Sequence, residues 1–418
     1  MTNTVDVVIL TNGPGEVATW VRPAVAALRV HFAALGQSLR ISVVLTPCPH
    51  ASGQEAAVLA QDPGIDRVQS PEGFFPFLLW GQTQQSWDWQ PQGLVIFLGG
   101  DAFYPLLVAR HLGYATLLYA EEQVRWPHWY TGLALRHENL MAQVPRRARA
   151  KAQVIGNLVA AQGTSRPAEH ETTCRPLIGL LPGSKPVKLT QGVPFALSVA
   201  EVLHAARPDL DFVIPLAPTL SPATLATYAL AEHNPLIKTL GWTEAHLENP
   251  QAELTPYLVT TQGVRVQVWQ TFPAHGLLAR CHLCLTTVGA NTAELGALGV
   301  PMLVVVPTHL PFKQMRAWGG LPGILAGLPG IGGWVADWTT RWTLSRAGLL
   351  AWPNIWAGRP IVPEQVGALT PAQVAATMLE LLEPERLARM RQELLQVRGS
   401  DDAPQALAAM AAKLVGYG

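Results

Sequence analysis

Short apolar runs recur along the chain, each followed by a glycine-rich turn and then by a stretch with helical spacing. Residues 7–10 lead into such a turn at residues 11–15, and residues 94–98 lead into another at residues 99–101. Apolar runs without a polar face are typical of parallel strands that are buried on both sides. Strands that alternate with helices in this manner predict the α/β class, with doubly wound sheets.

One break interrupts this pattern. Residues 163–173 are polar and aperiodic, which predicts a linker, and further strands are predicted from residue 177 onward. We therefore expect an N-terminal Rossmann-like domain over residues 1–160 and a second over residues 174–370. Helices are expected over residues 371–418, and packing back against the first domain is one arrangement open to them. Two such domains facing each other would form a ligand cleft at the carboxyl ends of both sheets.

Composition and charge narrow the function classes. Hydrophobic residues make up 49% of the 418 residues and charged residues 14%, which is typical of a folded globular protein. The 29 basic and 29 acidic residues balance, so no overall positive field would attract nucleic acid. The four cysteines lack the spacing of a metal site, and we expect buried thiols and no metal.

The sequence also bears on location. No uninterrupted apolar stretch reaches the ~20 residues that a membrane span needs, and no signal peptide is evident, so we expect a cytoplasmic protein. The 14 tryptophans and the basic residues 146–151 leave peripheral contact with the inner face of a membrane open. Apolar residues 74–80 are candidates for binding acyl chains or the bilayer surface, although core packing explains them equally well. A homodimer is also left open.

Two acidic residues of the N-terminal half follow predicted strands. Glu16 comes directly after Gly15, a position where a glycine lets the backbone approach a ligand closely. Asp101 follows the strand over residues 94–98, and a carboxylate there can act as a general base on a hydroxyl group. Asp101 is our first candidate for that base and Glu16 is the competing one. Either side chain has a simpler alternative role at the start of its own helix.

A first turn in the C-terminal half pairs small residues with a cation. Gly183, Ser184 and Lys185 follow a predicted strand, with a second cation at Lys188, and backbone N–H groups beside a positive charge suit a diphosphate. Further along, residues 352–365 are dense in small and polar side chains, which predicts a loop at a domain boundary.

A second turn in this half joins a buried strand to a helix. Gly289, Asn291 and Thr292 open that helix, whose N-terminus favours a phosphate group. Glu294 lies one turn further, where a carboxylate can accept hydrogen bonds from ribose hydroxyls, or can simply complement the helix dipole. The second half therefore predicts a nucleotide site.

Together, these segments resemble the lipid-A-disaccharide synthase family, which are glycosyltransferases of the two-domain GT-B class. The matching segments are residues 180–184, residues 289–294 with 299–302, and residues 353–355 with 363–364. The resemblance implies inverting transfer from a UDP-linked N-acylated glucosamine donor to a lipid-linked acceptor, with no metal or other cofactor. By position it assigns Glu294 to the ribose, Gly289, Asn291 and Thr292 to the diphosphate, and Asn354, Glu364 and Gln365 to the wall of the donor site.

The N-terminal half departs from the family pattern. Phe103 and Tyr104 follow Asp101-Ala102 where the family has a second Asp and an Asn, and residues 121–127 differ from the family's aromatic loop. Lys185 stands where the family has Arg. The chain is thus similar to the lipid-A-disaccharide-synthase-related proteins, and we expect a different acceptor. The alternatives are a UDP-sugar epimerase, disfavoured because the N-terminal loops are poor in acids and histidines, and a non-catalytic membrane-associated nucleotide-sugar-binding protein.

Overall fold

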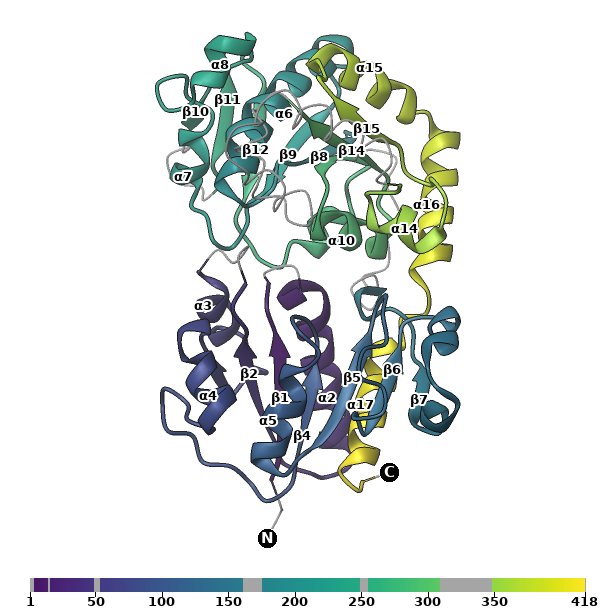
Figure 1. Cartoon of the computed structure of the whole chain (residues 1–418). Coiled ribbons are helices and arrows are strands. Elements are labelled where there is room, and N and C mark those ends of the chain that lie inside the picture. Colours follow the sequence, from purple (N-terminus) through teal and green to yellow (C-terminus); the bar gives the residue numbers. More distant parts are fainter. Residues whose placement is uncertain are drawn as a thin grey trace, which may run out of the picture. The chain divides into compact units, whose positions relative to one another are not determined.

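The computed structural model describes residues 4–13, 16–48, 53–160, 175–248, 255–308 and 348–417 (Figure 1). The chain forms two compact units, Met1–Thr164 together with Gly399–Gly418, and Ser165–Arg398. The predicted linker over residues 163–173 lies outside the described residues. The C-terminal helices are shared between the units, since α15 (Pro371–Leu381) and α16 (Pro384–Arg398) belong to the second and α17 (Ala403–Leu414) to the first.

The first unit contains a seven-stranded parallel sheet in the order β3-β2-β1-β4-β5-β6-β7. Its strands are β1 (Val5–Thr11), β2 (Leu39–Leu45), β3 (Arg67–Gln69), β4 (Gly93–Phe97), β5 (Ala115–Ala120), β6 (Gly132–Leu135) and β7 (Ala152–Val154). The strand order reverses between β1 and β4, and ligands of doubly wound sheets bind at the carboxyl ends of the strands beside such a reversal.

Both faces of this sheet are covered. Alternate β1 residues pack into different clusters, Val7 and Ile9 with α2 (Arg22–Ala34) and α17, Val8 and Leu10 with α4 (Phe74–Trp80) and α5 (Tyr104–Leu112). Figure 1 shows α17 beside α2, although more than 360 residues separate them in sequence. The remaining helical segments are the one-turn η1 (Val17–Val21), α3 (Glu55–Ala60), η2 (Pro71–Gly73), η3 (Glu138–Gln143) and η4 (Arg146–Lys151).

Helix α17 completes the core of the first unit. The side chain of Leu414 packs so closely over β6 that a Cβ atom on Gly132 would come within 2.8 Å of Leu414 Cδ1. Just beyond the helix, the ring of Tyr417 meets that of Phe32 edge to face, with centroids 6.5 Å apart. The segment that follows the second unit is therefore part of the first unit's core.

The second unit contains an eight-stranded sheet in the order β10-β11-β12-β9-β8-β13-β14-β15. Its strands are β8 (Leu177–Leu181), β9 (Asp211–Pro215), β10 (Ala245–Glu248), β11 (Tyr257–Thr260), β12 (Arg265–Trp269), β13 (Leu283–Thr287), β14 (Met302–Pro307) and β15 (Glu364–Gly367). All neighbours are parallel except β10 with β11 and β11 with β12. Here the order reverses between β8 and β13.

Helices cover this second sheet. They are α6 (Pro186–Ala206), α7 (Pro222–Thr227), α8 (Pro235–Leu240), α9 (His275–Leu278), α10 (Ala290–Leu298) and α14 (Trp352–Ala357), with α15 and α16. The predicted doubly wound α/β class is confirmed, and the antiparallel β10–β11 pair is an addition that the sequence pattern did not predict. Across the described residues, no helix combines the length and the apolar character needed to cross a membrane.

A buried ion pair ties together the amino-terminal edge of the first sheet. The Asp6 carboxylate, 1% exposed, accepts hydrogen bonds from Arg40 Nε at 2.6 Å and Arg40 Nη2 at 2.8 Å. It also accepts from the Tyr114 hydroxyl at 2.9 Å and the Gln90 backbone N–H at 2.7 Å. Arg40 reaches the more exposed Asp88 as well, at 2.8 Å. Four hydrogen bonds thus compensate the burial of one carboxylate.

We predict that Asp6→Ala destabilises the first unit by about 3 kcal/mol, because it leaves a partly buried guanidinium and two donors without their acceptor. The matched control is Asp88→Ala, which removes the exposed partner of the same arginine and should cost below about 1 kcal/mol. Hydrogen exchange of the β1 and β2 amides measures both losses. Equal protection in the two variants would contradict the prediction.

Candidate functional site

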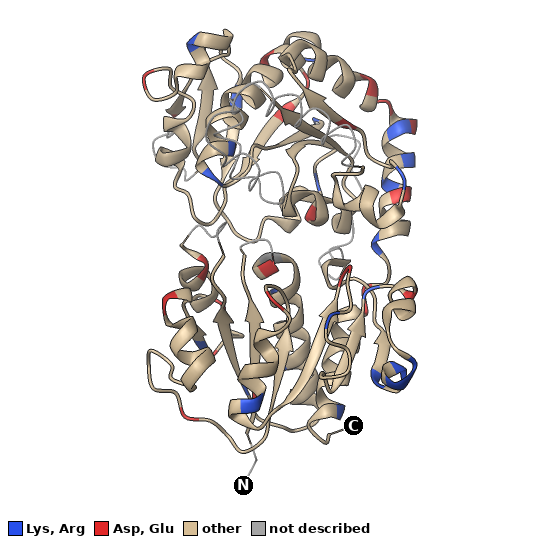
Figure 2. Cartoon of the chain, viewed as in Figure 1, with Lys and Arg blue, Asp and Glu red and all other residues tan. Residues whose placement is uncertain are grey.

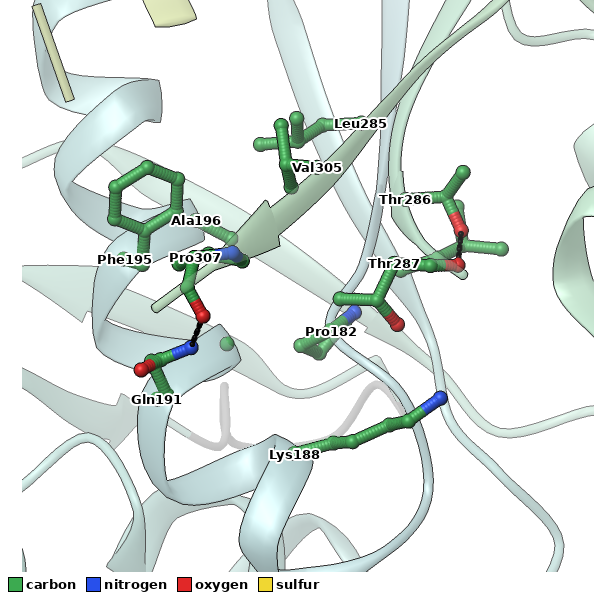
Figure 3. A pocket seen from close by; sticks show the side chains of 12 residues that line it. Pro182, Lys188, Gln191, Phe195, Ala196, Leu285, Thr286, Thr287, Val305 and Pro307 are labelled. Carbon is green, nitrogen blue, oxygen red and sulfur yellow. Dashed lines mark hydrogen bonds between the residues drawn. The ribbon is translucent and has the colours of Figure 1, made fainter. Parts of the chain in front are cut away.

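A pocket lies at the carboxyl ends of β8, β13 and β14, at the reversal of strand order in the second sheet (Figure 3). Its enclosed cavity is small, about 20 Å³, which is room for about one water molecule, so a larger ligand would lie at its open mouth. The strand ends contribute Leu181, Pro182, Leu285, Thr286, Thr287, Val305 and Pro307, and α6 contributes Lys188, Gln191, Gly192, Phe195 and Ala196. An apolar lining with a few polar groups is typical of a small-molecule site.

Lys188 is the cation of this pocket. It extends from the first turn of α6, and its Nζ donates a hydrogen bond of 2.6 Å to the carbonyl oxygen of Val288. Burial, and then the charge of Lys185, lower the pKa of Lys188 to about 8. Gly183, at φ +103°, makes room for the lysine, since a Cβ atom there would lie 3.0 Å from Lys188 Cβ and Cδ. Ser184 precedes the helix cap at Lys185, and neither residue lines the pocket.

Two buried polar atoms of the pocket lining make no hydrogen bond with the described residues. Gln191 donates through Nε2 to the carbonyl oxygen of Pro307 at 2.7 Å, but its buried Oε1 accepts nothing from the described residues. The Thr287 hydroxyl oxygen is likewise buried and unpartnered in this part of the chain. Buried polar atoms are normally hydrogen-bonded, so the pocket is suited to polar ligand atoms or ordered water.

The N-terminus of α10 borders the same strand end. Gly289 caps it at φ +145°, and a Cβ atom there would lie 3.4 Å from Lys188 Nζ. Asn291 is partly buried in the first turn. Thr292 is fully buried, its hydroxyl donating to the Gly289 carbonyl at 2.8 Å and accepting from the Trp352 N–H at 3.1 Å. The Thr292 side chain therefore joins the starts of α10 and α14.

Glu294 is held by a histidine that the sequence analysis did not single out. His275 Nε2 lies 3.0 Å from Glu294 Oε1, which links α9 to α10, and about a fifth of each side chain is exposed. One carboxylate oxygen is thereby oriented, and Glu294 does not line the pocket. A histidine that begins a four-residue helix carries no sequence pattern that would have identified it.

Asn354 and Glu364 form a buried support for α14. Asn354 is fully buried, its Oδ1 accepting from Ile361 N–H and Val362 N–H and its Nδ2 donating to Glu364 Oε1 at 2.7 Å. Glu364 Oε1 also accepts from the Ala351 N–H at 2.7 Å, directly before α14. These side chains fix the loop around the helix start, so their contribution to a ligand site is indirect.

Gln365, the third residue assigned to this wall, turns toward α15. Its Nε2 donates to Thr377 Oγ1 at 2.8 Å, and it does not line the pocket.

In the first unit, Gly15 lies outside the described residues. Glu16 lies at the carboxyl end of β1, and a Cβ atom on Gly99 would come within 3.0 Å of Glu16 Cγ.

The other predicted carboxylate, Asp101, is exposed. Its Oδ1 accepts a 2.9 Å hydrogen bond from the Phe103 N–H in the turn before α5, whereas the cap residue of α5 is Phe103, so Asp101 is not the helix cap considered from the sequence. Glu121 directly follows β5, within residues 121–127 where the sequence departs from the family pattern, and it was not among the predicted site residues. Burial raises the pKa of Glu121 to about 8, against the opposing effect of Arg136, while Glu122 and Glu16 raise it further.

The chain is similar in sequence to lipid-A-disaccharide synthases. Lipid-A-disaccharide synthase of Anaeromyxobacter sp. (strain K) is 29% identical over 274 residues, covering 63% of this chain and 57% of the relative. That of Nitrosococcus oceani is 23% identical over 229 residues, covering 54% and 44%. The chain spans about half the length of the curated relatives it matches. It is a distant homologue of lipid-A-disaccharide synthases, and no protein-family model matches it.

Solved structures show the fold. UDP-GlcNAc 2-epimerase from Neisseria meningitidis bound to UDP-GlcNAc aligns with 98% of this chain and 100% of its own, at a TM-score of 0.51 and 14% identity. Another UDP-N-acetylglucosamine 2-epimerase covers 100% and 98%, again at 0.51 and 14%. The fold is GT-B-like, as the sequence resemblance predicted.

We predict that Glu364→Ala frees the start of α14. The change removes the acceptor of the Ala351 N–H and of Asn354 Nδ2, which costs about 2 kcal/mol, or roughly 30-fold faster amide exchange over residues 350–362. Hydrogen exchange followed by mass spectrometry measures this. Glu380→Ala on the exposed surface of α15 is the control, and equal exchange in both variants would refute the assignment.

We also predict a pH-dependent stability that originates at Glu121. The folded chain keeps this proton up to about pH 8, whereas an ordinary glutamate loses it near 4.5. The stability from the neutral carboxyl is therefore fully present below about pH 4.5 and is lost as pH rises through about 8. Glu121→Gln should melt above wild type at about pH 9 and lose that advantage at about pH 5. Glu138→Gln, an exposed glutamate of η3 in the same unit, should follow wild type throughout.

Proposed function

We propose that this chain, a distant homologue of lipid-A-disaccharide synthases, is an inverting glycosyltransferase that takes a UDP-linked sugar as donor and a lipid or membrane-associated molecule as acceptor. The observation that carries the proposal is the strand-order reversal of the second unit, where Lys188 of the pocket lies beside Gly289 and the N-terminus of α10. Cations and helix N-termini at one strand end are suited to a diphosphate.

The chemistry of the donor half follows from these groups. Breaking the bond between sugar and diphosphate leaves negative charge on the diphosphate, and fixed dipoles and cations beside it lower the barrier. The backbone N–H groups that open α10 are one such source, and Lys188 is the other. Glu294, oriented by His275, accepts hydrogen bonds from the ribose hydroxyls in this proposal.

A lipid acceptor is supported by the surface of the first unit. Of the apolar residues 74–80, Phe74, Phe77 and Leu78 are buried, whereas Phe75, Leu79 and Trp80 are 52%, 51% and 66% exposed. Figure 2 shows the basic turn η4 beside β7 in the same unit. Exposed apolar side chains and a cationic turn both favour contact with an anionic membrane surface, which suits a cytoplasmic enzyme bound peripherally to the inner face.

We predict that UDP and UDP-N-acetylglucosamine raise the melting temperature of the chain, since a ligand at about 100 times its Kd adds about 2.7 kcal/mol to stability. Lys188→Met should weaken UDP binding roughly tenfold or more through the loss of a charge-assisted contact. Lys238→Met, on exposed α8 of the same unit, is the matched control. The same measurement of UDP binding on Lys185→Met tests Lys185, the other cation predicted from the sequence. Undiminished UDP binding by Lys188→Met would rule out the pocket as the diphosphate site.

Turnover separates the remaining alternatives. An epimerase acts on the UDP-sugar alone, so an epimerised sugar nucleotide formed without any acceptor would replace the transferase proposal. UDP binding without UDP release, hydrolysis or transfer to a bacterial lipid extract would instead support a non-catalytic binding protein. UDP release that increases when the extract is added supports the glycosyltransferase.

A further inference from the structure

The two carboxylates nominated from the sequence lie in surroundings that differ from each other. Asp101 is exposed, and one of its oxygens already accepts the Phe103 N–H. Glu16 lies at the carboxyl end of β1 against Gly99.

Glu121 occupies a different environment at the same edge of the first sheet. It directly follows β5, and the Arg136 N–H donates to the Ala120 carbonyl at 3.0 Å, so the residue after β6 runs beside it. The side chain is partly buried, and within the described chain its carboxyl makes no hydrogen bond and no ion pair. The charged and titratable groups that act on it are Tyr119, Arg136, Glu122 and Glu16.

Polar atoms without partners in the described chain lie at other strand ends of the same sheet. Asn12 Oδ1, after β1, is buried and accepts no hydrogen bond from any described residue, and it meets Glu16 over Gly99. Asn157, 4% exposed and located after β7, has an Nδ2 that likewise donates to nothing in the described ranges. Such a set of donors and acceptors is suited to a ligand rich in hydroxyl groups.

The loop that carries Asn157 is fixed to β5. The Tyr119 hydroxyl donates to the Gly156 carbonyl at 3.4 Å and accepts from the Leu158 N–H at 3.3 Å, on either side of Asn157. Trp20 of η1 packs edge to face on the same tyrosine, with ring centroids 5.9 Å apart. One buried tyrosine, two positions before Glu121, thus connects elements from both sides of the strand-order reversal.

We propose that Glu121 is the catalytic base that removes the proton from the acceptor hydroxyl, in a polar site at the carboxyl end of the first sheet. This inference rests on the proposed transferase function. The O–H bond breaks and its proton passes to the Glu121 carboxylate. The oxygen forms a bond to the anomeric carbon, and the bond from that carbon to the diphosphate oxygen breaks, its electron pair leaving with UDP. The proton then passes from Glu121 to solvent.

The surroundings of Glu121 explain why it is suited to this step. Burial makes its carboxylate a stronger base than an exposed one, and Arg136 stabilises the charged form that must be present before the transfer. Because the pKa of Glu121 is about 8, the reactive carboxylate becomes more abundant as pH rises through that value. The rate should therefore rise with pH and level off above about pH 8.

The experiment measures UDP release from UDP-N-acetylglucosamine, with and without a detergent-solubilised bacterial polar lipid extract, between about pH 6 and about pH 9. Glu121→Gln should lower the rate on the order of 10²–10⁴-fold and abolish its rise with pH, because the amide cannot accept the proton. Glu121→Asp should keep part of the rate. Glu138→Gln, at an exposed position of η3, is the matched control and should keep both the rate and the pH profile. UDP binding by thermal shift should stay within about twofold of wild type in all variants.

The outcomes separate the two proposals. If Glu121→Gln keeps half or more of the wild-type rate at about pH 8, Glu121 is not the base, while the donor site stands. If Asp101→Asn or Glu16→Gln removes the pH-dependent rise and Glu121→Gln does not, the base is that residue instead. If wild-type protein neither binds UDP nor releases it from the UDP-sugar, the transferase function fails, and the role of Glu121 fails with it.

Discussion

Both sheets are covered by packed side chains on both faces, so polar groups can meet a ligand only at the ends of strands. The first unit uses its two ends differently. At the amino end, Asp6 is saturated by Arg40, Tyr114 and a backbone donor. At the carboxyl end, Asn12 Oδ1 and Asn157 Nδ2 have no partner among the described residues. The edge whose polar groups are all hydrogen-bonded stabilises the fold. The edge with unpartnered donors and acceptors can form hydrogen bonds with a ligand.

The sequence predicted the α/β class and the central strands because a strand buried on both faces must be a continuous apolar run. The β10–β11 pair escaped prediction because it is a short antiparallel addition whose sequence lacks such a run. Within the candidate site, the sequence offers Lys185 and Lys188 as cations, and the structure brings Lys188 to the pocket. Lys185 is the extended cap residue before α6 and Lys188 lies in its first turn, so the choice depends on where the helix begins, a boundary that a sequence pattern leaves open by a few residues. Asp101 and Glu121 both follow buried strands, and only tertiary packing leaves one exposed and the other partly buried.

The segments that resemble the homologous synthases serve the architecture more directly than the ligand. Thr292 joins the starts of α10 and α14, and Asn354 with Glu364 holds the loop before α14. A buried asparagine with both ends of its amide engaged can be replaced by few other residues without leaving a donor or acceptor unpaired. A motif can therefore persist in a distant homologue because it holds a helix N-terminus in place, even where the ligand differs.

The return of the chain to the first unit affects how the protein is made. Leu414 packs over Gly132 and Tyr417 over Phe32, so the part of this face that α2 does not cover stays open until residues 399–417 have been synthesised. While a ribosome translates residues 165–398, that apolar part is exposed for the whole interval. The second unit, whose segments are contiguous, has no such dependence. The order of maturation is thus the reverse of the order of synthesis, and chaperone protection matters most for the half that emerges first.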